Sequence, residues 1–143
     1  MIVKESKIIY EEKDIPGLRK IKLNTNNNIY KYVTSVISAS NTPTEYLMVI
    51  ALDDRAQPVA HYIMGNSSEV EVAFSITSIL RFVILSGCDK FITVHNHPDD
   101  SKEFSTADIE SALHTKKQAK IIELELIGDY LIAGNRCIKN KKL

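Results

Sequence analysis

The first half of the chain divides, by its hydrophobic pattern, into a helix and two strands. The apolar positions of IYKYVTSVIS recur at helical intervals after a run of asparagines, which predicts a helix over about residues 28–40. Residues 45–52 are almost continuously apolar, and residues 58–64 follow them after a polar turn. This arrangement is typical of two strands that form a hairpin.

The middle of the chain predicts two further helices on either side of a short strand. Ser68, with Glu71 three residues later, has the form of a capping box, and helical periodicity continues to Leu85. The apolar run KFITVH has the length of a buried strand. Ser105 is a favourable N-cap residue and predicts a helix that ends at about Lys120.

The C-terminal part predicts two final strands, IIELELI and YLIAG, with a turn near Gly128 and Asp129. The complete order of elements favours an α/β or α+β sheet with helices packed on it. We interpret residues 1–27 as an N-terminal extension that could form a strand, and residues 28–143 as one domain. One domain is the usual expectation for a chain of 143 residues.

Composition predicts a soluble cytoplasmic protein. The 18 Lys and Arg residues balance 18 Asp and Glu residues, which weighs against direct binding to the phosphate backbone of DNA. No segment has the length and apolar character of a membrane span, and the N-terminus lacks the apolar core of a secretory signal. Cys88 and Cys137 form no CxxC pattern, which favours two buried free thiols in a reducing compartment.

The stretch VHNHPDDSKEFSTAD, residues 94–108, gathers side chains with metal-binding chemistry. Side chains two positions apart on a strand share a face, and Pro98 restricts His97 to extended conformations, so His95 and His97 should project together. Asp108 falls in the first turn of the next helix, facing the loop. Two imidazole nitrogens and a carboxylate oxygen suit Zn²⁺, with a fourth position left for water.

Each of these residues also has an ordinary structural interpretation. Ser105 as the N-cap and Asp108 in the first turn fit a plain helix start, where free backbone N–H groups favour an acid. Taken singly, His95 and His97 would more often be surface or core residues than ligands. The letters HNH do not indicate an HNH nuclease, because the residues of that motif are dispersed along a chain.

The combined spacing resembles the JAMM, or MPN-type, metalloprotease signature: an upstream Glu, then His-x-His, seven residues, and Ser-x-x-Asp. Residues 98–104 are the seven. Within this superfamily the chain is similar to RadC-like proteins, through HNHP and through EYLMVIALDDRAQPVAHYIM, which leads by a helix to FITVHNHP. The similarity covers about residues 28–138. It implies the JAB/MPN fold, a cytidine-deaminase-like, three-layer mixed sheet flanked by helices.

The resemblance also implies roles for individual residues. His95, His97 and Asp108 would be the Zn²⁺ ligands. Glu45 in TEYLMVIALD would be the general base acting through the metal-bound water, and Ser105 would hydrogen-bond the oxyanion. The reaction would be hydrolysis of a peptide or isopeptide bond, with a protein or peptide as the substrate.

Several positions depart from the RadC-like pattern. Asp99 and Asp100 stand where relatives commonly have Ser-Gly, and Tyr130 stands where they often have His. The helical N-terminal domain common in full-length RadC proteins has no counterpart here. Glu69 and Glu71 compete with Glu45 for the role of base, since only the resemblance selects Glu45.

A non-catalytic zinc-binding module or scaffold associated with DNA repair is the alternative function. RadC relatives carry a DNA-repair label, and an MPN domain can serve as a structural module. The neutral net charge argues against direct contact with DNA but leaves it open. A zinc deaminase is excluded, because it requires His-x-Glu and a distant Pro-Cys-x-x-Cys.

Overall fold

The computed structural model describes residues 11–37, 44–65 and 75–143. Its elements are α1 (Asn26–Val36), β1 (Tyr46–Leu52), β2 (Pro58–Gly65), α2 (Ile76–Ser86), β3 (Lys90–Asn96), α3 (Thr106–Ile121), β4 (Glu125–Ala133) and β5 (Arg136–Lys139). The order of helices and strands is the predicted one as far as α3, but the two predicted final strands, IIELELI and YLIAG, both overlap β4, and β5 was not predicted. Residues 11–25 contain turns and no strand, and the first ten residues of the predicted extension lie outside the described ranges.

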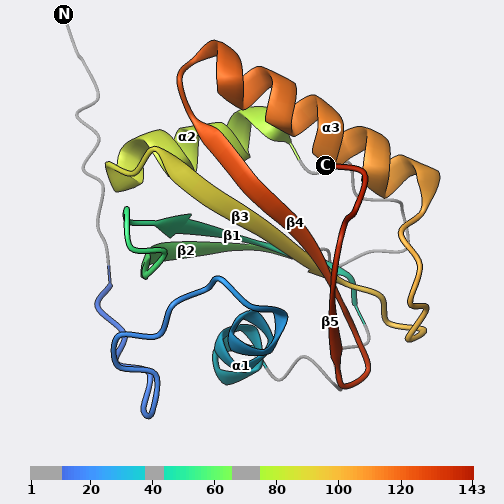
Figure 1. The fold of residues 1–143 in the computed structure, drawn as a ribbon, viewed down its shortest axis with the longest axis horizontal. Coiled ribbons are helices and arrows are strands. Elements are labelled where there is room, and N and C mark those ends of the chain that lie inside the picture. The colour runs from blue at the N-terminus through green and yellow to red at the C-terminus, as the bar shows by residue number, and fades with distance from the viewer. Residues whose placement is uncertain (1–10, 38–43, 66–74) are drawn as a thin grey trace, which may run out of the picture.

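The five strands form one mixed sheet in the order β2-β1-β3-β4-β5. The central pair β3 and β4 is parallel, and the other neighbouring strands are antiparallel. Helix α1 covers one face of the sheet, and α2 and α3 cover the other (Figure 1). The predicted α/β sheet with helices packed on it is therefore confirmed as a three-layer arrangement.

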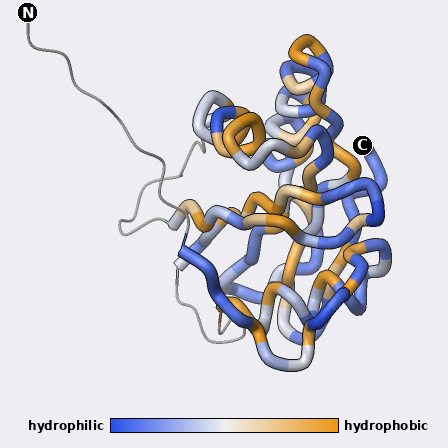
Figure 2. Tube along the Cα trace, turned by 90° about the vertical axis from the view of Figure 1, so that its left-hand side faces the viewer, coloured by the Kyte–Doolittle hydropathy of each residue, from blue (hydrophilic) through white to orange (hydrophobic). Residues whose placement is uncertain are grey.

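Each face of the sheet has its own hydrophobic core. On the α1 side, Val33 packs with Ile50 and Ile92, and on the opposite side Val83 of α2 packs with Phe91. Every residue of β1 is buried, as expected for an inner strand with helices on both faces. Figure 2 shows hydrophobic segments running through the middle of the molecule. No helix among the described residues is long and apolar enough to cross a bilayer.

Helix α2 begins later than the hydrophobic pattern predicted. Ser75 has φ −66° and ψ 113°, outside the helical region, and its side chain accepts a hydrogen bond from the backbone N–H of Ser78. A single helix from Ser68 to Leu85 is therefore wrong, because the Ser75 hydroxyl caps the helix at this point. The predicted capping box of Ser68 and Glu71 lies outside the described residues.

The predicted turn near Gly128 and Asp129 is also wrong, since β4 runs without interruption from Glu125 to Ala133. The ring of Tyr130 folds over Gly128, so that a Cβ at Gly128 would lie 2.7 Å from Cε2 of Tyr130. Glycine is therefore needed here for space and not for a turn. The carboxylate of Asp129, which suggested a turn, is buried within the sheet.

The two cysteines are free but only half-buried, which corrects the prediction of two buried thiols. Cys88 follows the end of α2, and Cys137 lies on the edge strand β5 at the margin of the α1-side core. Burial raises the pKa of the Cys137 thiol to about 12, so this thiol stays protonated at neutral pH.

We expect Gly128→Ala to destabilise the fold by about 1–3 kcal/mol, because the added methyl group must displace the buried Tyr130 ring. Urea unfolding gives the change in the free energy of unfolding. Gly65→Ala is the matched control, since a Cβ there would meet no atom within 4 Å. Equal stability of the two variants would contradict the role assigned to the Tyr130 ring.

Candidate metal centre

The end of β3 presents two histidines on one face of the sheet. His95 pairs with Leu47 of β1 and Leu131 of β4, and it is only 6% exposed. His97 lies just past the strand, where its backbone N–H donates to the carbonyl of Ile132 at 3.2 Å and keeps the chain extended. The two imidazole centroids are 5.1 Å apart.

Asp108 approaches the histidines from the first turn of α3. Its backbone N–H donates to Oγ of Ser105 at 3.1 Å, and its Oδ2 accepts from the backbone N–H of Ser105 at 2.7 Å. These reciprocal bonds form a capping box, so the ordinary helix-start interpretation of the two residues is correct. They also hold the carboxylate toward the histidines.

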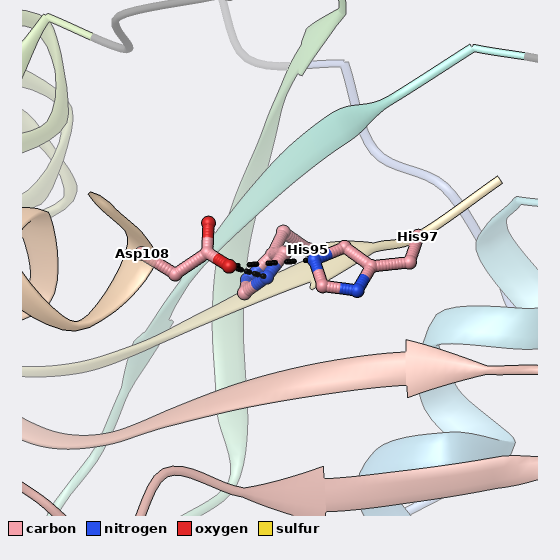
Figure 3. A group of neighbouring side chains, drawn as sticks. All are labelled: His95, His97 and Asp108. Carbon is pink, nitrogen blue, oxygen red and sulfur yellow. Dashed lines mark ion pairs between the residues drawn. The ribbon is translucent and has the colours of Figure 1, made fainter. Parts of the chain in front are cut away.

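The three candidate ligand atoms converge at one point (Figure 3). Oδ2 of Asp108 lies 3.7 Å from Nε2 of His95 and 3.4 Å from Nε2 of His97. All three atoms lie within 4.8 Å of one another. A tetrahedral Zn²⁺ with bonds of about 2.0–2.1 Å places neighbouring ligand atoms about 3.4 Å apart, so the two distances from Asp108 suit one small ion.

The ring nitrogens of the histidines support a metal independently of the distances. Nε2 of His95 is buried without a hydrogen-bond partner, a state that costs about 1–3 kcal/mol unless a ligand or ion satisfies it. Nδ1 of His97 lies 3.0 Å from the carbonyl oxygen of Ser101, which only accepts. In the neutral ring this bond places the proton on Nδ1 and leaves the Nε2 lone pair available for a metal.

The loop after the histidines is tied to the sheet by Asp100. The Asp100 backbone N–H donates to the carbonyl of His97 at 3.0 Å, and the Asp100 carboxylate accepts from the N–H of Gly134 at 2.9 Å. Asp100 has φ 57°, in the left-handed region that favours glycine. Its side-chain hydrogen bond offsets the cost of that conformation and fixes the loop that carries Ser101.

The electrostatics of the cluster favour one positive charge beside Asp108. Burial by itself would raise the pKa of Asp108, but the neighbouring His95 and the hydrogen bonds from Ser105 hold this pKa far below its usual range. Burial disfavours protonation of His95, yet Asp108, Asp129 and Glu45 together raise its pKa. A cation bound between these groups would take the place of that proton.

A cavity of about 50 Å³ adjoins two of the three candidate ligands. His95, Asp108 and Glu45 all line it. Glu45 is half-buried and immediately precedes β1, two positions before Leu47, whose side chain faces the α2 and α3 layer. The structure thus brings Glu45 to the histidine face of the sheet, whereas Glu69 and Glu71 lie outside the described residues.

Ser105 sits at the rim of this arrangement. Ser105 is exposed and does not line the cavity, whereas Asp108, to which it is hydrogen-bonded, lines it. In the capping box Oγ acts as an acceptor, which leaves the hydroxyl proton free to be donated elsewhere.

Two buried polar residues near the site were not identified from the sequence. Asp129 accepts a hydrogen bond from the Thr93 hydroxyl at 2.8 Å and one from the Asn140 amide at 3.1 Å, and it lines the same cavity. Asn96, between the two histidines, is 2% exposed. The available signal is a polar residue inside an otherwise apolar strand.

Comparison with known proteins identifies relatives for most of the chain. The model of the RadC-like JAB domain family matches residues 23–141. A UPF0758 protein of Coprothermobacter proteolyticus is 24% identical over 104 residues, which cover 73% of this chain and 43% of that protein. UPF0758 proteins of Psychrobacter cryohalolentis and Cyanothece sp. are 29% and 30% identical, over 67% and 64% of this chain.

The matched part spans 43%, 42% and 37% of these three relatives, which is less than half of each. The similarity therefore concerns the domain that contains the candidate metal centre.

We expect Zn²⁺ to stabilise the protein against unfolding, by about 2.7 kcal/mol when free Zn²⁺ is 100 times its dissociation constant. His97→Ala should abolish this stabilisation, because it removes one of the three converging ligand atoms. Thermal or urea unfolding with and without Zn²⁺ measures the effect. His114→Ala is the control, since His114 is an exposed residue on α3 outside the cluster. Equal stabilisation of the two variants by Zn²⁺ would refute the site.

Proposed function

Since the chain belongs to the RadC-like JAB domain family, we propose that it is a zinc-dependent hydrolase of peptide or isopeptide bonds. The observation that carries the proposal is the buried, unpartnered Nε2 of His95 beside Nε2 of His97 and Oδ2 of Asp108. Three protein ligands leave one position of a tetrahedral ion for water or substrate, which is the arrangement of catalytic rather than structural zinc sites.

His95, His97 and Asp108 would hold the ion. When bound, Zn²⁺ would lower the pKa of a coordinated water to about 7 and polarise the carbonyl of the scissile bond. The tether from His97 to Ser101 and the capping box at Asp108 keep two of these ligands oriented before any ion arrives. Preorganised ligands reduce the free-energy cost of binding.

Glu45 would act as the general base and then as the general acid. Its carboxylate would accept a proton from the attacking water and deliver it to the nitrogen of the departing amine, as an acid–base group at such a site must. Its position is suited to this role, because Glu45 lines the cavity shared with His95 and Asp108 and belongs to neither the ligand set nor the capping box.

Ser105 would donate its hydroxyl proton to the oxyanion that develops on the carbonyl oxygen. The hydroxyl oxygen is held in place by the backbone N–H of Asp108, so the donor would be oriented before the substrate binds. The substrate would be a protein or peptide segment whose backbone reaches the rim between Ser105 and the histidine loop.

We expect Glu45→Gln to lower kcat for a cleaved peptide by about 10²–10⁴-fold, the usual contribution of general acid–base catalysis. Affinity for Zn²⁺ should change little, because Glu45 is not one of the converging ligands. A peptide library identifies the substrate, and competition with a chelator gives the affinity. Glu110→Gln, an exposed change on α3, is the control.

Retention of wild-type kcat by Glu45→Gln would exclude Glu45 as the base. A wild-type protein that binds Zn²⁺ but cleaves no peptide would instead favour a metal-binding module without turnover.

Ser105→Ala should lower kcat by about 10²–10³-fold, the usual cost of removing one oxyanion donor. It should also cost about 0.5–2 kcal/mol of stability through loss of the N-cap. Ser75→Ala separates these effects, because Ser75 caps α2 with the same type of hydrogen bond. If both variants lose the same fraction of kcat, Ser105 acts only as a helix cap.

A further inference from the structure

Asn96 occupies the position between the two candidate histidine ligands and is 2% exposed. Because side chains alternate along a strand, Asn96 projects away from His95 and His97, to the α1 side of the sheet. It has the same orientation as Val94, which belongs to the core on that side. A buried carboxamide in an apolar layer must find hydrogen-bond partners to be tolerated.

Both partners of the Asn96 amide are backbone groups on either side of Glu45. Oδ1 of Asn96 accepts from the backbone N–H of Tyr46 at 2.8 Å, and Nδ2 donates to the backbone carbonyl of Thr44 at 3.1 Å. The Asn96 side chain is therefore hydrogen-bonded to the residue before Glu45 and to the residue after it. We refer to these two hydrogen bonds as the Asn96 clamp.

The Asn96 clamp takes the place of backbone hydrogen bonds between β1 and β3 at the end of their pairing. Backbone pairing of β1 with β3 ends at Leu47 opposite His95, one step before Tyr46 would meet Asn96. Past this point the backbone of β3 continues toward β4, where the N–H of His97 donates to Ile132. The Asn96 amide, which has the same donor and acceptor as a peptide group, extends the attachment of the β1 segment to β3.

We propose that Asn96 is a positioning residue that holds Glu45 at a fixed distance from the metal centre. The end of β3 then determines where His95, His97 and Glu45 lie. The two histidines provide ligands on one face of the sheet, and Asn96, on the opposite face, fixes the backbone around Glu45. The inference rests on the proposed function for what Glu45 does. Misplacement of a catalytic group by about 1 Å can cost on the order of 100-fold in rate.

The test uses Asn96→Leu, which keeps the size of the side chain and removes both hydrogen bonds. Loss of the clamp should speed exchange of the Tyr46 amide proton by about 3–10-fold, the value of one net hydrogen bond. In the Co²⁺-loaded protein, the pseudocontact shift of the Glu45 amide proton should change, since this shift reports position relative to the ion.

Kinetics separate positioning from general damage to the fold. Asn96→Leu should lower kcat by about 10–100-fold. KM and the affinity for Zn²⁺ should stay within about 3-fold of wild type, because the effects of changes at independent sites differ from additivity by only a few tenths of a kcal/mol. Val94→Ala is the matched control, because it removes packing from the same face of the same strand without touching the clamp. Val94→Ala should lower the free energy of unfolding. It should leave the pseudocontact shift of the Glu45 amide proton unchanged and kcat within about 3-fold of wild type.

Asn96→Asp is the second variant if Asn96→Leu does not fold. In its ionised form, at a pH above the pKa of the introduced carboxyl, it keeps the acceptor for the Tyr46 N–H and loses the donor to the Thr44 carbonyl, so Tyr46 should stay protected while kcat falls. Wild-type kcat in Asn96→Asp with the carboxyl ionised, or an unchanged Glu45 shift in Asn96→Leu, would overturn the inference.

Failure of the proposed function has a different signature. A wild-type protein that cleaves no peptide would refute hydrolysis, while Tyr46 exchange, which needs neither metal nor substrate, would still test the clamp. If Asn96→Leu left that exchange unchanged, the clamp itself would be refuted.

Discussion

A buried imidazole nitrogen without a hydrogen-bond partner is the constraint around which this domain is organised. Nε2 of His95 lies at the end of a central strand, enclosed by protein, and faces the carboxylate of Asp108. Leaving such an atom unsatisfied costs free energy that the core must supply. A metal ion between His95, His97 and Asp108 would remove this cost. Binding of the ion and stability of the fold would then be thermodynamically linked.

Contacts made mainly between residues close in sequence orient the three candidate ligands. The extended chain past β3 sets the separation of the histidines, the capping box orients Asp108, and the bond to Ser101 sets the tautomer of His97. Asp100 fixes the loop that follows the histidines. It adopts the left-handed conformation that suits glycine, and its carboxylate accepts a hydrogen bond from the backbone N–H of Gly134, which a glycine could not do.

Features that depend on contacts between residues close in sequence could be predicted, and features that depend on contacts between distant residues could not. The histidine pair and the capping box rest on contacts within a few residues, so their spacing alone indicated their arrangement. The turn assigned to Gly128 and Asp129 failed because the reasons for these residues are tertiary. Tyr130 covers the glycine, and partners from β3 and from beyond β5 satisfy the aspartate. Asn96 was missed for the same reason, since its partners are about 50 positions away.

The most direct measurement is an anomalous difference map from crystals grown with Zn²⁺, recorded on both sides of the zinc absorption edge. Our account predicts one strong peak bonded at about 2.0–2.2 Å to Nε2 of His95, Nε2 of His97 and a carboxylate oxygen of Asp108. A map without density between these atoms, or a zinc ion held by other side chains, would contradict it.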